Sequence, residues 1–194
     1  MTDEKNDPDI IDHDVPRIAE EIARRAIIIQ CVIAAGYGVS KKNIRQWLKE
    51  ECLWGHVSPR EQKFLLTSKP TKKEVFGATW RAECQVALLW SIQKIESLGS
   101  LSGHCDSALL VDAVPGLLTP TSDFISHAVL REREVIDDEY EKIYNAHCEV
   151  RHAIREGTLI PDGMIPGIVQ ERHYAMNWIT GYCGQGWDDI TTDT

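Results

Sequence analysis

Two stretches of the chain are apolar on nearly every side when they are read as helices. They cover residues Ile27 to Ala35 and Ala82 to Ile92. A surface helix keeps one polar face, whereas a helix without a polar face needs neighbours all round it. We therefore expect two central helices with the other elements packed around them. No alternating run longer than a few residues occurs, so strand signals are poor.

Helix start and stop signals place the remaining elements. Asp14 is expected to cap the first helix, whereas Ser58-Pro59-Arg60-Glu61 and Thr71 to Glu74 are capping boxes that begin two others. The predicted helices cover residues 15–36, 40–51, 58–66, 71–98, 105–114, 133–156 and 168–180. This pattern predicts an all-α, single-domain irregular bundle of six to eight helices, with room for short strands around Leu159 or the C-terminus.

The length and the charge distribution bound the domain organisation. A chain of 194 residues fits one sizeable core. Its first fourteen residues hold six acidic side chains and one lysine, a composition typical of a solvated segment. We expect a flexible acidic arm over residues 1–14, followed by a single helical domain over residues 15–194.

The overall charge bears on the partners. Lys and Arg number 21 and Asp and Glu 30, which gives a formal net charge of −9. This balance argues against nucleic acid, whose binding depends on a basic surface, and favours a basic protein partner. The apolar stretches are too short for a bilayer, the acidic start does not resemble a signal peptide, and the six cysteines form no CxxC pair. We expect a cytoplasmic protein that enters no membrane.

Glu83 interrupts an apolar stripe of the second central helix. The stripe consists of Phe76, Trp80, Glu83, Ala87 and Trp90, at alternating spacings of four and three. A buried carboxylate must find a cation or take up a proton. Arg81 points to another side of that helix, so the candidate partners are Arg24, Arg25 and Arg172.

The densest polar sequence is Glu171 to Trp178. His173 and Asn177 share one helix face, and Tyr174 and Trp178 share the adjoining one. These side chains have two interpretations: they orient a substrate and move a proton, or they hydrogen-bond one another and tie helices together. His147, on the apolar stripe of its own helix, is expected to be a core histidine with one partner.

The C-terminal Trp187-Asp188-Asp189 predicts an anchored tail, because a solvated tail has no physical need for tryptophan. Its carboxylates are expected to meet a cation such as Arg172, or a metal. The usual metal, phosphate, nucleophile and dinucleotide motifs are all missing, so we expect no metal and no cofactor. Cys183 is expected to be the one exposed thiol.

Several phrases resemble an uncharacterised bacterial family, the domain of unknown function 4272. They are Arg25 to Gln30, Ser58 to Glu61, Trp80 to Glu83 with Leu88-Leu89-Trp90, Glu171 to Trp178, and the closing Trp187-Asp188-Asp189 with Asp193-Thr194. They span the chain from about residue 17 to its end. Cys148 stands where the family would have a tryptophan after the histidine. The resemblance implies no particular activity.

Two functional hypotheses follow. The first is a protein-binding module, for example an inhibitor or immunity-like partner of a basic toxin or nuclease. The second is a small enzyme of hydrolytic or acid-base type, with Glu83, His173 and Asn177 as catalytic candidates. Further binding candidates are Arg81, Glu171, Arg172, Tyr174, Trp178, Trp187, Asp188 and Asp189. The enzyme predicts that these groups share a concave pocket, whereas the module predicts that they are buried as structure.

Overall fold

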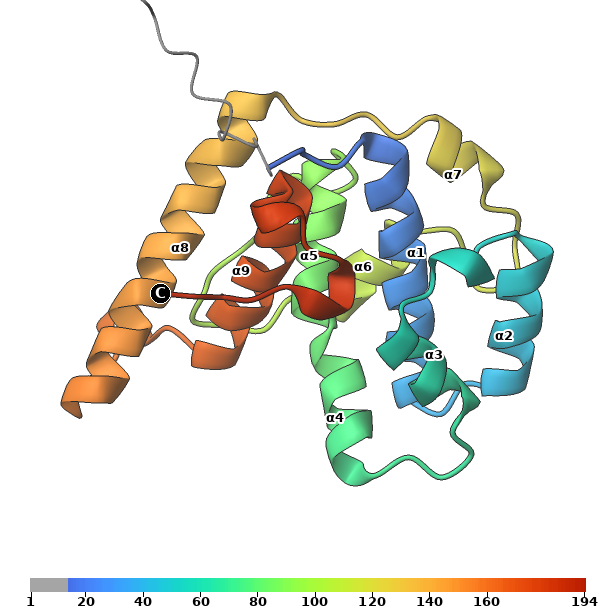
Figure 1. Ribbon diagram of the computed structural model, residues 1–194, viewed down its shortest axis with the longest axis horizontal. Coiled ribbons are helices and arrows are strands. Elements are labelled where there is room, and N and C mark those ends of the chain that lie inside the picture. Colours follow the sequence, from blue (N-terminus) through green and yellow to red (C-terminus); the bar gives the residue numbers. More distant parts are fainter. Residues whose placement is uncertain (1–13) are drawn as a thin grey trace, which may run out of the picture.

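The computed structural model describes residues 14–194, which fold into helices without any strand in that range (Figure 1). The α-helices are α1 (Ala19–Gly36), α2 (Lys41–Glu50), α3 (Pro59–Leu66), α4 (Lys72–Trp80), α5 (Ala82–Ser91), α6 (Ser107–Asp112), α7 (Ser122–Ser126), α8 (Arg133–Glu156) and α9 (Pro166–Thr180). Short 3-10 turns are η1 (Trp54–His56), η2 (Pro161–Gly163), η3 (Tyr182–Gly184) and η4 (Trp187–Asp189). The all-α prediction is confirmed, and Leu159 lies in an exposed loop.

Helix α1 is buried on all sides because it belongs to two cores. One face, with Ile22, Ala26 and Ile29, packs into a cluster with α5 and α9. The opposite face, with Ile28 and Val32, packs against α2, α3 and α4. The apolar sequence of this helix therefore has the neighbours that it requires.

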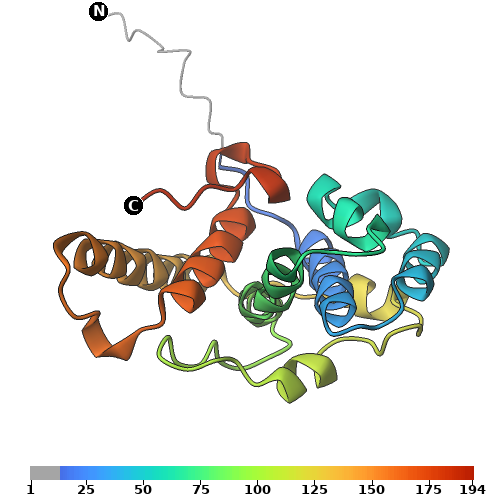
Figure 2. The same cartoon turned by 90° about the horizontal axis from the view of Figure 1, so that it is seen from below.

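Helix α5 lies between α1 and α9, and α8 packs on α9 (Figure 1). Every residue from Glu83 to Ser91 is buried. Figure 2 shows the C-terminal segment on one side of the α5–α9 pair and the segment around α6 on the other. None of the helices in residues 14–194 combines the length and the apolar character needed to span a membrane.

Local capping signals set three helix starts as predicted. The Ser40 hydroxyl accepts the amide of Asn43 at the start of α2. Ser58 with Glu61, and Thr71 with Glu74, form complete capping boxes at α3 and α4. Each box satisfies backbone amides that a helix N-terminus leaves without a partner.

Two of the predicted helices have wrong boundaries. The first helix begins at Ala19, because the Asp14 carboxylate accepts the distant Cys183 amide at 2.7 Å and does not cap α1. The predicted helix over residues 71–98 is two helices, separated at Arg81, and the second ends at Ser91. The bend leaves Phe76 62% exposed, off the buried stripe where we expected it. Residues 14–194 form nine α-helices, or eight when the consecutive helices α4 and α5 are counted as one bent helix.

Helix α9 ends where the sequence predicts, at a glycine in the left-handed conformation. Gly181 has φ 81°, and the Val15 backbone passes directly over its Cα. A side chain there would carry the conformational penalty and would also clash with the Val15 backbone. Gly157, which ends α8 at φ 65°, has open space around it.

We predict that Gly181→Ala destabilises the protein far more than Gly157→Ala. The second substitution carries only the left-handed penalty, about 1 kcal/mol, whereas the first also displaces Val15. Urea unfolding of both variants measures the difference. Equal losses would show that the Val15 segment does not pack against the end of α9.

Candidate functional site

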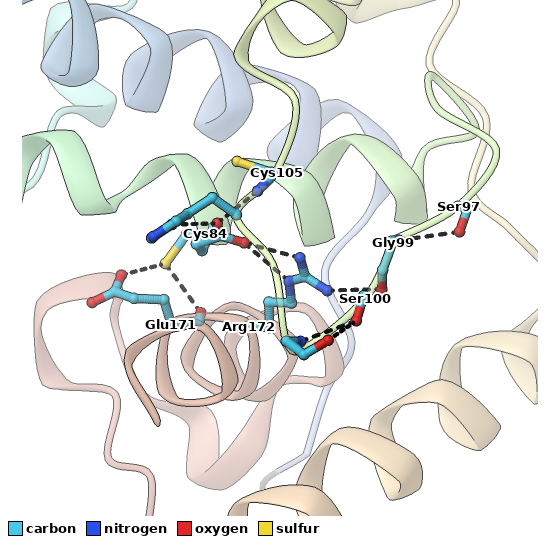
Figure 3. Close-up of polar contacts among 10 residues, drawn as sticks. Cys84, Ser97, Gly99, Ser100, Cys105, Glu171 and Arg172 are labelled. Carbon is cyan, nitrogen blue, oxygen red and sulfur yellow. Dashed lines mark hydrogen bonds and ion pairs between the residues drawn. The ribbon is translucent and has the colours of Figure 1, made fainter. Parts of the chain in front are cut away.

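Glu83 on α5 and Arg172 on α9 form a buried ion pair. The Arg172 Nη2 and Nε lie 3.0 and 3.2 Å from Glu83 Oε2, and the two residues are only 1% and 2% exposed. The other carboxylate oxygen, Oε1, accepts the Cys105 amide at 3.0 Å, and Arg172 Nη1 donates to the Gly99 carbonyl (Figure 3). The structure thus identifies which of the three candidate arginines pairs with Glu83.

Glu171, the neighbour of Arg172, points away from that pair (Figure 3). Its Oε2 accepts from Arg81 Nη1 at 3.1 Å and from the Cys84 thiol at 3.0 Å. Burial, and then the Glu171 carboxylate, raise the pKa of the Cys84 thiol well above its ordinary value. The thiol is therefore a protonated donor and a poor nucleophile.

His173 meets His147 rather than Glu83. Their Nδ1 atoms lie 2.8 Å apart where α8 packs on α9, and both side chains are buried. Burial lowers the pKa of both, that of His173 to about 4. One ring must donate and the other accept, so the accepting ring must be neutral, and the lowered pKa values keep both rings neutral near pH 7. His147 is the core histidine with one partner that the sequence predicted.

Asn177 ties α9 to the C-terminal segment. Its Nδ2 donates to the Thr191 carbonyl at 2.7 Å, and the residue is 1% exposed. No hydrogen bond or ion pair joins Glu83 to His173 or Asn177 among residues 14–194. Glu83 is therefore separate from His173 and Asn177, which lie one turn apart on α9 and interact with each other.

The C-terminal segment is anchored by aromatic packing. Trp187 is buried and stands edge-on to Tyr174 and Trp178, with ring centroids 5.1 and 5.4 Å away. The Tyr174 hydroxyl donates to the Trp187 carbonyl. The Arg25 guanidinium lies 4.9 Å from the Trp187 ring. These contacts give the C-terminal tryptophan the burial that the sequence suggested.

Asp188 does not meet Arg172 as we expected. Its carboxylate accepts the Ser58 hydroxyl at 2.7 Å and the Arg60 amide at 2.8 Å, at the N-terminus of α3. The exposed backbone amides and the dipole of that helix end favour a negative charge. Asp188 therefore bonds to this helix end and not to a cation. Asp189 is exposed.

A cleft of about 460 Å³ lies between α3, α4 and η4. Its walls are Val32, Arg60, Glu61, Lys63, Phe64, Glu74, Gly77, Ala78, Arg81, Glu171, Trp187 and Asp188. Four predicted binding residues therefore meet there: Arg81, Glu171, Trp187 and Asp188. Glu83 and Arg172 reach only the walls of two smaller pockets, of about 280 and 240 Å³.

Sequence reasoning missed several residues of this cleft. Glu61 was assigned only to a capping box, yet its Oε2 also accepts Arg25 Nη1 at 2.7 Å in a second buried ion pair. Arg60 and Lys63 are exposed basic residues of α3, which no pattern distinguishes from a solvated surface. Cys52 is exposed as well as Cys183, so Cys183 is not the one exposed thiol. Within residues 14–194, no group of three or more His, Cys, Asp or Glu side chains is placed to hold a metal ion.

The fold and these contacts define a single all-α domain with buried ion pairs behind an open cleft. The chain matches the family model described as Domain of unknown function (DUF4272) over residues 10–190, and it belongs to that family. No curated protein and no solved structure matches it significantly. The family resemblance seen in the sequence is confirmed, and the family description assigns no activity.

We predict that Glu83→Gln lowers the free energy of unfolding by about 3–5 kcal/mol, because it leaves the Arg172 charge buried without its counter-ion. Asp137→Asn is the matched control, since Asp137 pairs with Arg133 at 2.7 Å on the surface. Its loss should stay below about 1 kcal/mol. Urea unfolding at pH 7 measures both, and a Glu83→Gln protein as stable as the parent would refute a structural role for this pair.

We also predict that stability falls as the pH drops below about 6.5, the ordinary histidine pKa. The unfolded chain binds protons in that range, whereas buried His173, with a pKa of about 4, does not. The stability contributed by the neutral pair is therefore complete above pH 6.5 and is lost towards pH 4. In His173→Gln the free energy of unfolding should depend less on pH between pH 7 and 5. The exposed control His152→Gln should keep the pH dependence of the parent.

Proposed function

We propose that this protein acts by binding rather than by catalysis, and that the 460 Å³ cleft is its contact surface. One observation carries the proposal. Glu83, His173 and Asn177, which would have to perform acid-base chemistry, are at most 2% exposed and bond to other parts of the chain. Catalysis would require at least one of them within reach of a substrate.

The cleft has the properties of a binding site without an evident reaction centre. Its volume lies in the range of about 300–1,000 Å³ that ligand pockets occupy. Buried Phe64, Ala78 and Trp187 supply apolar walls, and charged side chains surround them. The thiol behind Glu171 is buried and protonated, which leaves the cleft without an activated cysteine.

The prediction of a basic partner concerns a different surface. Of the net charge of −9, six acids and one lysine place −5 in residues 1–14, which leaves −4 for the rest of the chain. Exposed carboxylates that lack an ion-pair partner among residues 14–194 occur on several elements, for example Glu50 on α2, Asp112 on α6, and Glu134, Asp138 and Glu141 on α8. A basic protein, such as the partner of an inhibitor or immunity-like module, would be steered towards these residues rather than into the cleft.

We predict that small fragments bind in the cleft and that filling it abolishes their binding. A set of neutral, cationic and anionic fragments is titrated into ¹⁵N-labelled protein, and the shifted amides should include those of Arg60, Lys63 and Ala78. Gly77 lines the cleft and has open space at its Cβ position, so Gly77→Leu should fill the cleft without a clash.

Gly55→Leu is the control, since Gly55 also has open space but does not line the cleft. Fragments should bind this variant as they bind the parent. If the shifts gather elsewhere, or if Gly77→Leu leaves them unchanged, the cleft is not the binding surface.

A further inference from the structure

The Arg81 guanidinium is fixed in the cleft with part of its donor set open. Its Nη1 donates to Glu171, and its Cζ lies over the Tyr174 ring, 4.5 Å from the ring centroid. The side chain remains 25% exposed, and its Nε and Nη2 donate to no other residue of the described chain. A guanidinium held in this way loses little side-chain entropy when a ligand binds its remaining donors.

The carboxylates around the cleft are already engaged. Glu61 accepts from Arg25, Asp188 accepts from the N-terminus of α3, and Glu171 accepts from Arg81 and Cys84. Glu74 closes the capping box at α4. Each of these carboxylates thus accepts hydrogen bonds from the protein itself, and Glu61 and Glu171 also form ion pairs.

The basic residues of the rim, in contrast, have side chains without a close ionic partner in the described range. Arg60 and Lys63 are exposed and form no ion pair with another residue in the range 14–194. Together with the open donors of Arg81, they leave hydrogen-bond donors free at a cleft whose four carboxylates already accept hydrogen bonds. A carboxylate can bind to such free cationic donors, although the lining as a whole holds four carboxylates and three cations.

We propose that this cleft recognises a carboxylate carried on a short apolar chain. The inference rests on the proposed binding function and names the chemistry of the bound group. The planar fork of Arg81 matches a carboxylate, and the walls formed by Val32, Phe64 and Trp187 match its hydrocarbon part. The neighbouring Glu171 carboxylate opposes a doubly charged phosphate more than a single carboxylate.

A matched set of three small molecules tests the head group. Butyrate and butyramide share a propyl group, butylammonium carries a butyl group one carbon longer, and the three differ in charge. Titrated into ¹⁵N-labelled protein, butyrate should shift the Arg81 Nε–H resonance and the amides of the cleft, with a dissociation constant of about millimolar. Butyramide and butylammonium should bind at least about tenfold more weakly, and so should inorganic phosphate.

Variants then assign the contact. Arg81→Gln should weaken butyrate at least about tenfold, and Lys63→Gln should weaken it by a smaller factor and reduce its dependence on salt. Lys63→Gln keeps the test decisive if Arg81→Gln fails to fold, because Lys63 is exposed and makes no ion pair within residues 14–194. Arg155→Gln, on the exposed side of α8, is the control and should leave binding unchanged.

Two sources of the carboxylate are separated by a further titration. Acetyl-glutamate methylamide mimics an acidic side chain of a partner protein, whereas butyrate mimics a free organic acid; tighter binding by either one supports the proposal and names the source. The proposal is overturned if butyramide or butylammonium binds as well as butyrate, or if Lys63→Gln and Arg81→Gln both bind butyrate like the parent. In the first case the cleft still binds ligands and the proposed function stands; if no fragment of any charge binds there, both fail.

Discussion

The buried ion pair between Glu83 and Arg172 sets how α5 lies against α9, and the cleft depends on that arrangement. Two charges inside a protein core are tolerated only when each one meets its counter-ion and further hydrogen bonds, which restricts the helices to one register. In this register Arg172 turns towards the segment around Gly99 and Cys105, and its neighbour Glu171 turns towards Arg81. We therefore infer that the pair on one side of α9 helps to position the charges on the other side.

The C-terminal turn η4 completes the cleft by linking distant elements. Trp187 packs against two aromatic rings of α9, and Asp188 binds the N-terminus of α3. Both contacts use groups that would be costly to leave unsatisfied, namely a large apolar surface and the backbone amides of a helix end. Asp188 engages that helix end through the Arg60 backbone amide, and the Arg60 side chain stays exposed.

Local signals predicted those parts of the fold that depend on neighbouring residues. The capping boxes at Ser58 and Thr71 begin helices as expected, and the apolar α1 and α5 lie inside the bundle. The start of α1 could not be predicted in this way, because Asp14 bonds to Cys183 from the far end of the chain. No glycine or proline stands at Arg81, so the sequence gives no local signal for the bend there. The bend lies beside contacts between distant residues, where the Trp80 ring packs on Gly167 and leaves no room for a side chain.

The same distinction applies to the site. Glu83 was identified because a carboxylate in an apolar stripe is conspicuous, and the choice among three arginines needed the structure. The role proposed for Arg60 and Lys63 depends on Arg81 and Trp187, which line the same cleft but lie far from them in sequence.

The most direct test of this account is a double-mutant cycle between Glu83 and Arg172. Free energies of unfolding of Glu83→Gln, Arg172→Met and the double variant give the coupling between the two side chains. We predict that this coupling exceeds about 1 kcal/mol, as expected for a buried, hydrogen-bonded ion pair. A coupling below about 0.5 kcal/mol would mean that the two charges do not depend on each other, and that another interaction fixes α5 against α9.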